Sequence, residues 1–246
     1  MDPRTRKLRA RSFGSVAEAY ERARPEYPIE AVTWLAGEPP RDVVDVGAGT
    51  GKLTRLLAAA GHRVIAVEPL PEMRAELERA VPGVAVLDGT GEAVPLPDAS
   101  ADVVTVAQAF HWFDQPEALA EIARVLRPGG TLGLVWNTRD DREPWVAELR
   151  DAATGREGVA AYEAEQAVAA AGAFGPLEAA TFGLVQRLDR HTLLELVLSR
   201  SYCAVLMAEE RAPVLARVER IFDEYARDGV IELPYVAECF RAVRRR

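Results

Sequence analysis

The stretch of sequence that decides the fold is Val43-Val44-Asp45-Val46-Gly47-Ala48-Gly49-Thr50-Gly51. A short apolar run leads directly into glycines that alternate with Ala48 and Thr50, and a helical pattern follows from Lys52. Glycine has no Cβ atom, so a loop of this composition lets a ligand approach the backbone closely. The stretch therefore predicts a buried strand, then a ligand-contacting loop, then a helix.

Strand and helix patterns alternate around this stretch. We expect strands at residues 41–46, 63–67, 84–87, 102–107 and 131–136, and helices at 13–23, 29–36, 52–60, 71–80 and 116–126. This alternation specifies an α/β fold with a doubly wound, mostly parallel sheet and helices on both faces. The nearly continuous apolar strands fit burial on both sides of the sheet.

The pattern changes after Asn137. Residues 140–172, 192–208 and 211–226 are expected to be mostly helical, with strands at 181–188 and 230–243. Two late strands without a normal helical crossover indicate an antiparallel addition, which makes a seven-stranded sheet with an antiparallel last strand and a helical cap. Pro234 predicts a break or an edge position in the last strand.

Composition restricts the function. The 246 residues carry 30 basic and 38 acidic side chains, a net charge of −8, which argues against a protein that tracks nucleic-acid phosphates. Cys203 and Cys239 form no metal or disulfide pattern. There is no long apolar run and no signal peptide, so we expect a cytoplasmic protein with no membrane or nucleic-acid partner.

Glu68 follows the second expected strand. A carboxylate at this place in a doubly wound sheet binds the ribose hydroxyls of a nucleoside. A dinucleotide fingerprint requires a further glycine three residues after Gly49, where Lys52 stands. This spacing weakens a nicotinamide-dependent oxidoreductase as an alternative but leaves it open.

Further motifs carry a family resemblance. They are Met73 after Glu68, Gly89–Glu92, PLPD at 95–98, QAFHWFD at 108–114 and VLRPGG at 125–130, with Phe13, Ala17, Tyr20 and RPEYP at 24–28 near the start. Together they resemble the class I S-adenosylmethionine-dependent methyltransferases with a methyltransferase type 11 domain. Within that family they are similar to the small-molecule branch that includes trans-aconitate methyltransferases. The resemblance covers residues 13–137 well and 176–243 more weakly.

The resemblance implies S-adenosyl-L-methionine as the cofactor and a set of residues around it. Asp45 would anchor the amino group, Glu68 the ribose, and Met73 would pack on the adenine. The full implied set is Tyr20, Arg24, Asp45, Gly47, Ala48, Gly49, Glu68, Pro69, Met73, Gly91, Glu92 and Gln108. Asp45 as a simple loop cap stays open. The family often has alanine where Gly91 stands, which puts the local packing in question.

His111 follows the fourth strand, at the sheet edge where ligands bind. A sulfonium donor is already activated, so the protein mainly aligns the reactants. Three roles of His111 stay open: a catalytic base, a residue that positions the acceptor, or a structural residue. No metal site is expected. The residues proposed to line the acceptor are His111, Trp112, Phe113, Trp136, Trp145, Arg200 and Tyr202. The aromatic residues as plain core, and Arg200 as plain surface, are alternatives, while His62 and His191 are expected at the surface.

We therefore expect a methyltransferase that acts on a small organic acceptor, with oxygen as the first choice of acceptor atom. Residues 1–137 would bind the cofactor, 138–229 would form a mainly helical lid with one strand, and 230–246 would return to the sheet. A regulator that binds the cofactor without turnover is a second alternative. A homodimer is left open.

Overall fold

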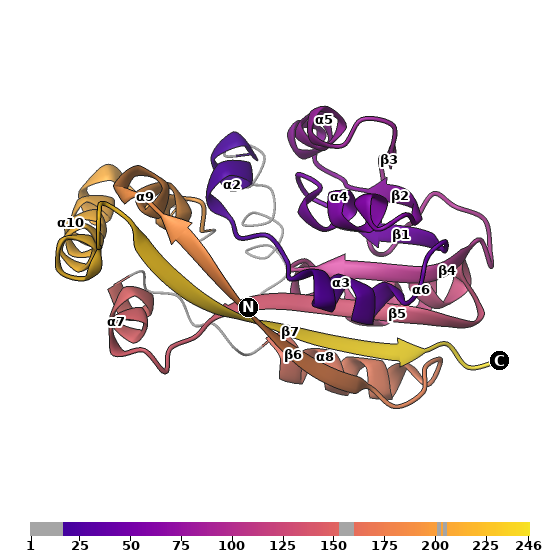
Figure 1. Cartoon of the computed structure of the whole chain (residues 1–246). Helices are drawn as coiled ribbons and strands as arrows, with labels where there is room; N and C mark the ends of the chain where they lie inside the picture. Colours follow the sequence, from indigo (N-terminus) through magenta and orange to yellow (C-terminus); the bar gives the residue numbers. More distant parts are fainter. Residues whose placement is uncertain (1–16, 153–159, 201–202, 204–205) are drawn as a thin grey trace. The chain divides into compact units, whose positions relative to one another are not determined.

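The computed structural model describes residues 17–152, 160–200, 203 and 206–246. In these residues the strands form one seven-stranded sheet with the order β3-β2-β1-β4-β5-β7-β6 (Figure 1). The strands are β1 (Asp42–Val46), β2 (Arg63–Val67), β3 (Ala85–Leu87), β4 (Ala101–Ala107), β5 (Leu126–Arg139), β6 (Glu178–Leu188) and β7 (Ile231–Val243). Strands β3, β2, β1, β4 and β5 pair in parallel. The predicted Rossmann-like sheet with an antiparallel last strand is confirmed.

The chain divides into two compact units, which we describe separately. The glycine-loop unit comprises the described residues of Glu26–Asn137, Gly158–Phe182 and Ala237–Arg246. The helical unit comprises the described residues of Met1–Pro25, Thr138–Glu157 and Gly183–Val236.

The glycine-loop unit holds the parallel strands and their helices. These are α3 (Ile29–Ala36), α4 (Lys52–Ala59), α5 (Pro71–Ala80), the short η2 (Phe110–Trp112), α6 (Gln115–Val125) and α8 (Ala160–Ala171). Helix α3 packs against α4, and α6 packs against α8. Alternate strand residues such as Val104, Val106, Leu132 and Leu134 are fully buried against Ile122 of α6. Burial on both sides explains why these strands are apolar throughout.

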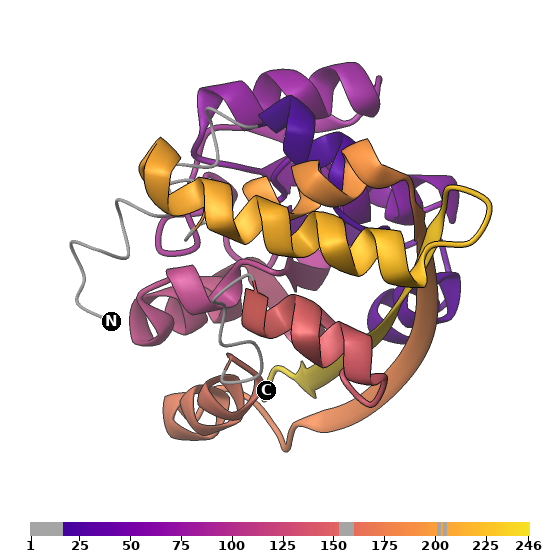
Figure 2. The ribbon, with the colours of Figure 1, turned by 90° about the vertical axis from the view of Figure 1, so that its left-hand side faces the viewer.

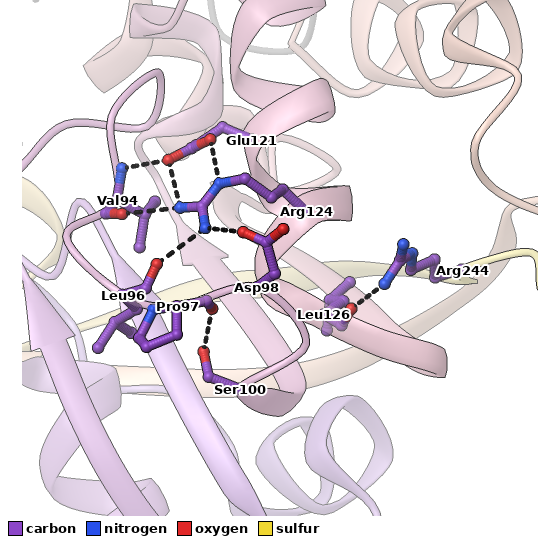
Figure 3. Close-up of polar contacts among 9 residues, drawn as sticks. All are labelled: Val94, Leu96, Pro97, Asp98, Ser100, Glu121, Arg124, Leu126 and Arg244. Atoms are coloured by element: carbon purple, nitrogen blue, oxygen red, sulfur yellow. Dashed lines mark hydrogen bonds and ion pairs between the residues drawn. The ribbon is translucent and has the colours of Figure 1, made fainter.

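Arg124 of α6 fixes the PLPD loop (Figure 3). Its guanidinium donates to the carbonyl oxygens of Val94 and Leu96 and to the carboxylates of Asp98 and Glu121, at 2.6–3.0 Å. Glu121 in turn accepts from the backbone N–H of Val94 at 2.9 Å. The loop that follows Gly91 and Glu92 is therefore tied to a helix by charge-assisted hydrogen bonds.

The helical unit has its own core. Helices α2 (Ala17–Ala23), α7 (Pro144–Ala152), α9 (Arg190–Leu198) and α10 (Ala208–Tyr225) pack so that α9 contacts α2 and α10, and α10 also contacts α7 (Figure 2). Leu149, Leu193, Leu196 and Phe222 are buried between them. No helix among the described residues is long and apolar enough to cross a membrane.

Three expectations are wrong. The helix expected at 192–208 ends at Leu198, and just after it the Ser199 hydroxyl donates a hydrogen bond to the carbonyl of Leu196. The next helix, α10, begins at Ala208. Pro234 neither breaks β7 nor marks an edge strand, because β7 lies between β5 and β6 and the Pro234 carbonyl still accepts from Asp140 N–H at 3.0 Å.

His62 is buried rather than exposed, and this burial lowers the pKa of its imidazole. His191 is exposed as expected.

Candidate functional site

The glycine loop follows β1 with its backbone in the left-handed region. Gly47 has φ +68° and Gly49 φ +58°, a conformation that glycine adopts without cost. A Cβ atom on Gly47 would lie 2.7 Å from Cβ of Ala109, so this glycine permits close packing. At Gly49, in contrast, no heavy atom of the described chain beyond Gly49 and its two neighbours lies within 4 Å of the Cβ position. The space beside the Gly49 backbone is therefore open, and a ligand can approach it there.

Glu68 stands beside this loop at the end of β2. Its Oε2 accepts from Gly49 N–H and its Oε1 from Leu70 N–H, both at 2.9 Å. Burial raises the pKa of the Glu68 carboxyl, and these two backbone hydrogen bonds oppose that rise. The carboxylate is thus fixed in place by main-chain donors, as a group that binds a ligand must be.

Asp45 lies beneath the loop and is fully buried. Its oxygens accept from the hydroxyls of Thr54 in α4, at 2.6 Å, and Thr105 in β4, at 2.8 Å. Burial raises the pKa of Asp45 to about 6, although both hydrogen bonds act to lower it. These hydrogen bonds join the end of β1 to α4 and β4, and the predicted contact of Asp45 with a ligand stays a prediction.

Lys52 occupies the place of the missing third glycine. It begins α4, is buried, and its Nζ lies 3.3 Å from Oε1 of Glu26, which also accepts from Arg55 at 2.9 Å. Gly51 before it has φ +88° and would place a Cβ 2.8 Å from Leu77 of α5. Glu26 was not predicted as part of this region, because its link to Lys52 depends on packing between segments.

The residues predicted to surround a nucleoside base differ in their exposure. Met73 is buried and Pro69 is exposed. Glu92 Oε1 accepts from the backbone N–H of Asp114 at 2.7 Å. A Cβ on Gly91 would lie 2.6 Å from the Phe113 ring. The ring therefore explains why glycine stands where the family often has alanine.

Gln108 directly follows β4 and has a strained backbone conformation. Its φ of +56° lies in the left-handed region, which is rare for a residue with a side chain and is common at functional sites. Its Nε2 donates to the carbonyl of Asn137 at 3.2 Å, and Asn137 Nδ2 donates to the carbonyl of Glu26 at 2.9 Å. The Asn137 Oδ1 atom is buried without a partner in the described structure. Asn137 is therefore a further candidate site residue, which the sequence did not indicate.

His111 lies among aromatic rings after β4. The indole N–H of Trp136 donates to His111 Nδ1 at 3.3 Å, and the Trp112 ring lies 4.7 Å from the imidazole. An indole nitrogen only donates, so a neutral His111 bonded in this way keeps its hydrogen on Nε2. That nitrogen then donates rather than accepts. The geometry favours the positioning role of His111 over the role of base.

The other predicted residues lie in the helical unit. The Arg24 guanidinium lies 5.0 Å from the centroid of the Tyr20 ring and donates to Oγ and the carbonyl oxygen of Ser199, both at 3.0 Å. Trp145 stacks on Tyr225, with a centroid distance of 5.8 Å. Arg200 is half-buried. Tyr202 and Phe13 lie outside the described residues.

Arg139, at the end of β5 in the helical unit, was also missed. It is 4% exposed, and its Nε and Nη2 atoms have no hydrogen-bond partner among the residues that the structure describes. A charged residue at the carboxyl end of a strand is the one sequence signal that marks it. No group of three or more histidine, cysteine or acidic residues able to hold a metal occurs in the described part of the chain.

Comparisons with known proteins agree with this geometry. Residues 44–134 match the family described as "Methyltransferase domain". An uncharacterized methyltransferase of Mycobacterium tuberculosis is 46% identical over 234 residues, which are 94% of this chain and 95% of that protein. A malonyl-[acyl-carrier protein] O-methyltransferase of Serratia marcescens is 33% identical over 129 residues, 48% of this chain and 51% of its own. A solved structure from Anaeromyxobacter dehalogenans, provisionally described as a type II methyltransferase, has a TM-score of 0.69 and 28% identity, and the match covers 90% of this chain and 97% of that one.

Proposed function

Because the chain belongs to the class I S-adenosylmethionine-dependent methyltransferases, we propose that it methylates a small organic acceptor, with oxygen as the favoured acceptor atom. The observation that carries this proposal is the pair formed by Gly49 and Glu68. An open stretch of glycine backbone stands beside a carboxylate held at the end of the second strand. This is the place where a doubly wound sheet binds a nucleoside.

The residues of the glycine-loop unit fit S-adenosyl-L-methionine. The open position at Gly49 lets a ligand contact the backbone, and Glu68 retains lone pairs for two hydroxyl groups. In this proposal Glu68 binds the ribose, Gly47, Ala48 and Gly49 pass beside the methionine part, and Asp45 anchors the amino group, directly or through water. Pro69, Met73, Gly91, Glu92 and Gln108 surround the rest of the cofactor, and the family resemblance adds Tyr20 and Arg24 to the predicted set. The cofactor supplies a methyl group that its sulfonium already activates.

For the acceptor, the chain supplies orientation and the exclusion of water. His111 donates a hydrogen bond from Nε2 while Trp136 holds its other nitrogen. Trp112, Phe113 and Trp136 are the aromatic residues proposed to line the acceptor, and the rings of Phe113 and Trp136 are largely buried. The lid role of residues 138–229, with Trp145, Arg200 and Tyr202, stays a prediction, and the described residues of Gly158–Phe182 in that range belong to the glycine-loop unit. Holding the acceptor in line with the methyl group lowers the barrier through proximity and orientation.

Oxygen is favoured for two reasons. A carboxylate acceptor has no proton to lose at neutral pH, so its methylation needs no base, which agrees with a histidine that donates. In addition, a relative that matches about half of this chain is described as an O-methyltransferase. The net charge of −8 supports a small molecule over nucleic acid as the acceptor.

Incubation of the protein with methyl-labelled S-adenosylmethionine and a panel of carboxylic acids, phenols and amines tests this proposal. We expect transfer of label to at least one carboxylic acid, as a base-labile methyl ester. Transfer only to amines would contradict the oxygen assignment. Tight binding of S-adenosylhomocysteine without transfer to any acceptor would favour a regulator instead.

A further inference from the structure

The guanidinium of Arg139 carries buried hydrogen-bond donors. Only 4% of the residue is exposed, and neither Nε nor Nη2 has a hydrogen-bond partner in the described structure. These two nitrogens form one edge of the guanidinium, the edge that binds a carboxylate through two parallel hydrogen bonds. Leaving buried polar groups unpaired costs free energy, so native proteins keep such groups mainly where they serve a purpose.

Tyr235 lies opposite Arg139 on the neighbouring strand. Strand β7 runs antiparallel to β5, and the hydrogen bond from Asp140 N–H to the carbonyl of Pro234 sets their register. In this register Arg139 and Tyr235 form a directly opposed pair, whose side chains point to the same face of the sheet. Tyr235 is 2% exposed, and its hydroxyl is also buried without a hydrogen-bond partner in the described part of the chain. The guanidinium N–H groups of Arg139 and the hydroxyl of Tyr235 are therefore unpaired donors, within the described structure, on the same face of the sheet.

Two further arginines lie in this region: Arg24 is close enough to Arg139 and Tyr235 for their charges to act on it, and Arg200 lies near Arg24. The pKa of Arg24 is lowered to about 10, chiefly by burial and also by the nearby charges of Arg200 and Arg139, while Tyr20 and Tyr235 act in the opposite direction. None of these contributions comes from a carboxylate of the described residues. Glu195 on α9 is engaged elsewhere, by Arg22 at 2.7 Å. Like charges held together under burial are unfavourable unless an anion joins them.

We propose that Arg139 and Tyr235 form a carboxylate-binding site in the helical unit, and that its ligand is the methyl acceptor. Arg139 binds the carboxylate through its Nε and Nη2 edge, and the Tyr235 hydroxyl donates to one oxygen. This inference rests on the proposed function for the identity of its ligand and deepens it by naming the acceptor class. The acceptor is an acid that the helical unit recognises by its charge.

Calorimetry on the full-length chain tests the site. The protein is first titrated with S-adenosylhomocysteine and then, with that ligand bound, with benzoate, succinate, inorganic phosphate and the neutral benzamide and succinamide. We expect at least one carboxylate to bind saturably while its amide does not. Arg139→Met should weaken that binding at least about tenfold, and Tyr235→Phe should weaken it severalfold. Arg187→Met is the matched control, because Arg187 lies on β6 of the same unit with an exposed side chain.

Several results would overturn the inference. They are no saturable binding of either carboxylate, equal binding by wild type and Arg139→Met, or tighter binding of phosphate than of any carboxylate. If Arg139→Met does not fold, Arg139→Lys and Tyr235→Phe decide: unchanged carboxylate affinity in both overturns the site. The cofactor titration separates the two proposals, since failure to bind S-adenosylhomocysteine contradicts the proposed function, whereas its binding without carboxylate binding contradicts only this site.

Discussion

The backbone N–H of Gly49 donates a 2.9 Å hydrogen bond to Oε2 of Glu68. This bond joins the glycine loop after β1 to the end of β2, so the two parts of the sequence pattern form one structural feature. Leu70 N–H holds the second carboxylate oxygen from the other side. The position of the carboxylate relative to the loop is therefore set before any ligand arrives, which reduces the entropy cost of binding.

Gly49→Ala should weaken cofactor binding without unfolding the protein. The new methyl group would meet no protein atom but would fill the open space at the loop. Gly83→Ala is the matched control, because Gly83 also has a positive φ, +90°, and nothing within 4 Å of its Cβ position. We expect each variant to lose roughly 1 kcal/mol of unfolding free energy through backbone strain. Only Gly49→Ala should lose affinity for S-adenosylhomocysteine, by at least about tenfold, or 1.4 kcal/mol. Equal affinity of the two variants would remove Gly49 from the site.

Gly91→Ala should destabilise the protein because its Cβ would lie 2.6 Å from the Phe113 ring. Overpacking of this kind costs roughly 1–3 kcal/mol. In a Phe113→Ala background the same substitution should cost far less, since the ring that it strikes is gone. Chemical denaturation of the four proteins of this double-mutant cycle measures the difference. If the two substitutions lower the free energy of unfolding additively, Phe113 is not the reason that position 91 requires glycine.

Local patterns predicted much of the fold. Strand Arg63–Val67 and helix Pro71–Ala80 match their expected bounds, because Pro71 starts the helix and an apolar run defines the strand. Strand β5 extends well beyond the expected 131–136, since its ends are set by pairing with β7. His62 lies in a turn that reads as surface, and only tertiary packing buries it.

The candidate site divides in the same way. Glu68 and the glycine loop belong to neighbouring strand ends, so their meeting follows from sequence order and parallel pairing. Arg139 and Tyr235 meet only because a late strand inserts beside β5 in antiparallel register. Neither residue belongs to a motif. Such contacts depend on which distant segments pair in the sheet, and a single sequence carries no direct signal for that pairing.

Asp45 should make stability depend on pH. Its folded-state pKa of about 6 lies above the usual value of 3.8, so the folded protein takes up a proton before the unfolded chain does. Stability therefore rises as pH falls through 6, by roughly 1.4 kcal/mol between pH 8 and pH 5. Asp45→Asn should lose this part of the pH dependence. Urea unfolding of both proteins at the two pH values checks it, and parallel pH profiles would show that Asp45 is ionised throughout.

His111→Ala should lower turnover and leave affinity for S-adenosylhomocysteine near that of wild type. His111→Gln distinguishes the two chemical roles, because its amide can still donate a hydrogen bond but cannot take a proton. Positioning by the Nε2 hydrogen predicts that His111→Gln retains much of the turnover lost in His111→Ala. A base role predicts similar losses in both, of roughly 10²–10⁴-fold. Labelled-methyl transfer rates at saturating cofactor measure the difference.

The most direct test of the central claim is calorimetric titration of wild type, Glu68→Ala and Glu72→Ala with S-adenosylhomocysteine and, separately, with NADH. Glu72 is the control, an exposed glutamate in the first turn of α5. We predict that wild type and Glu72→Ala bind S-adenosylhomocysteine alike and that none of the three proteins binds NADH. Glu68→Ala should bind S-adenosylhomocysteine roughly 1–3 kcal/mol more weakly, the cost of losing a buried polar partner. Binding of NADH alone by wild type, or unchanged affinity in Glu68→Ala, would contradict the account.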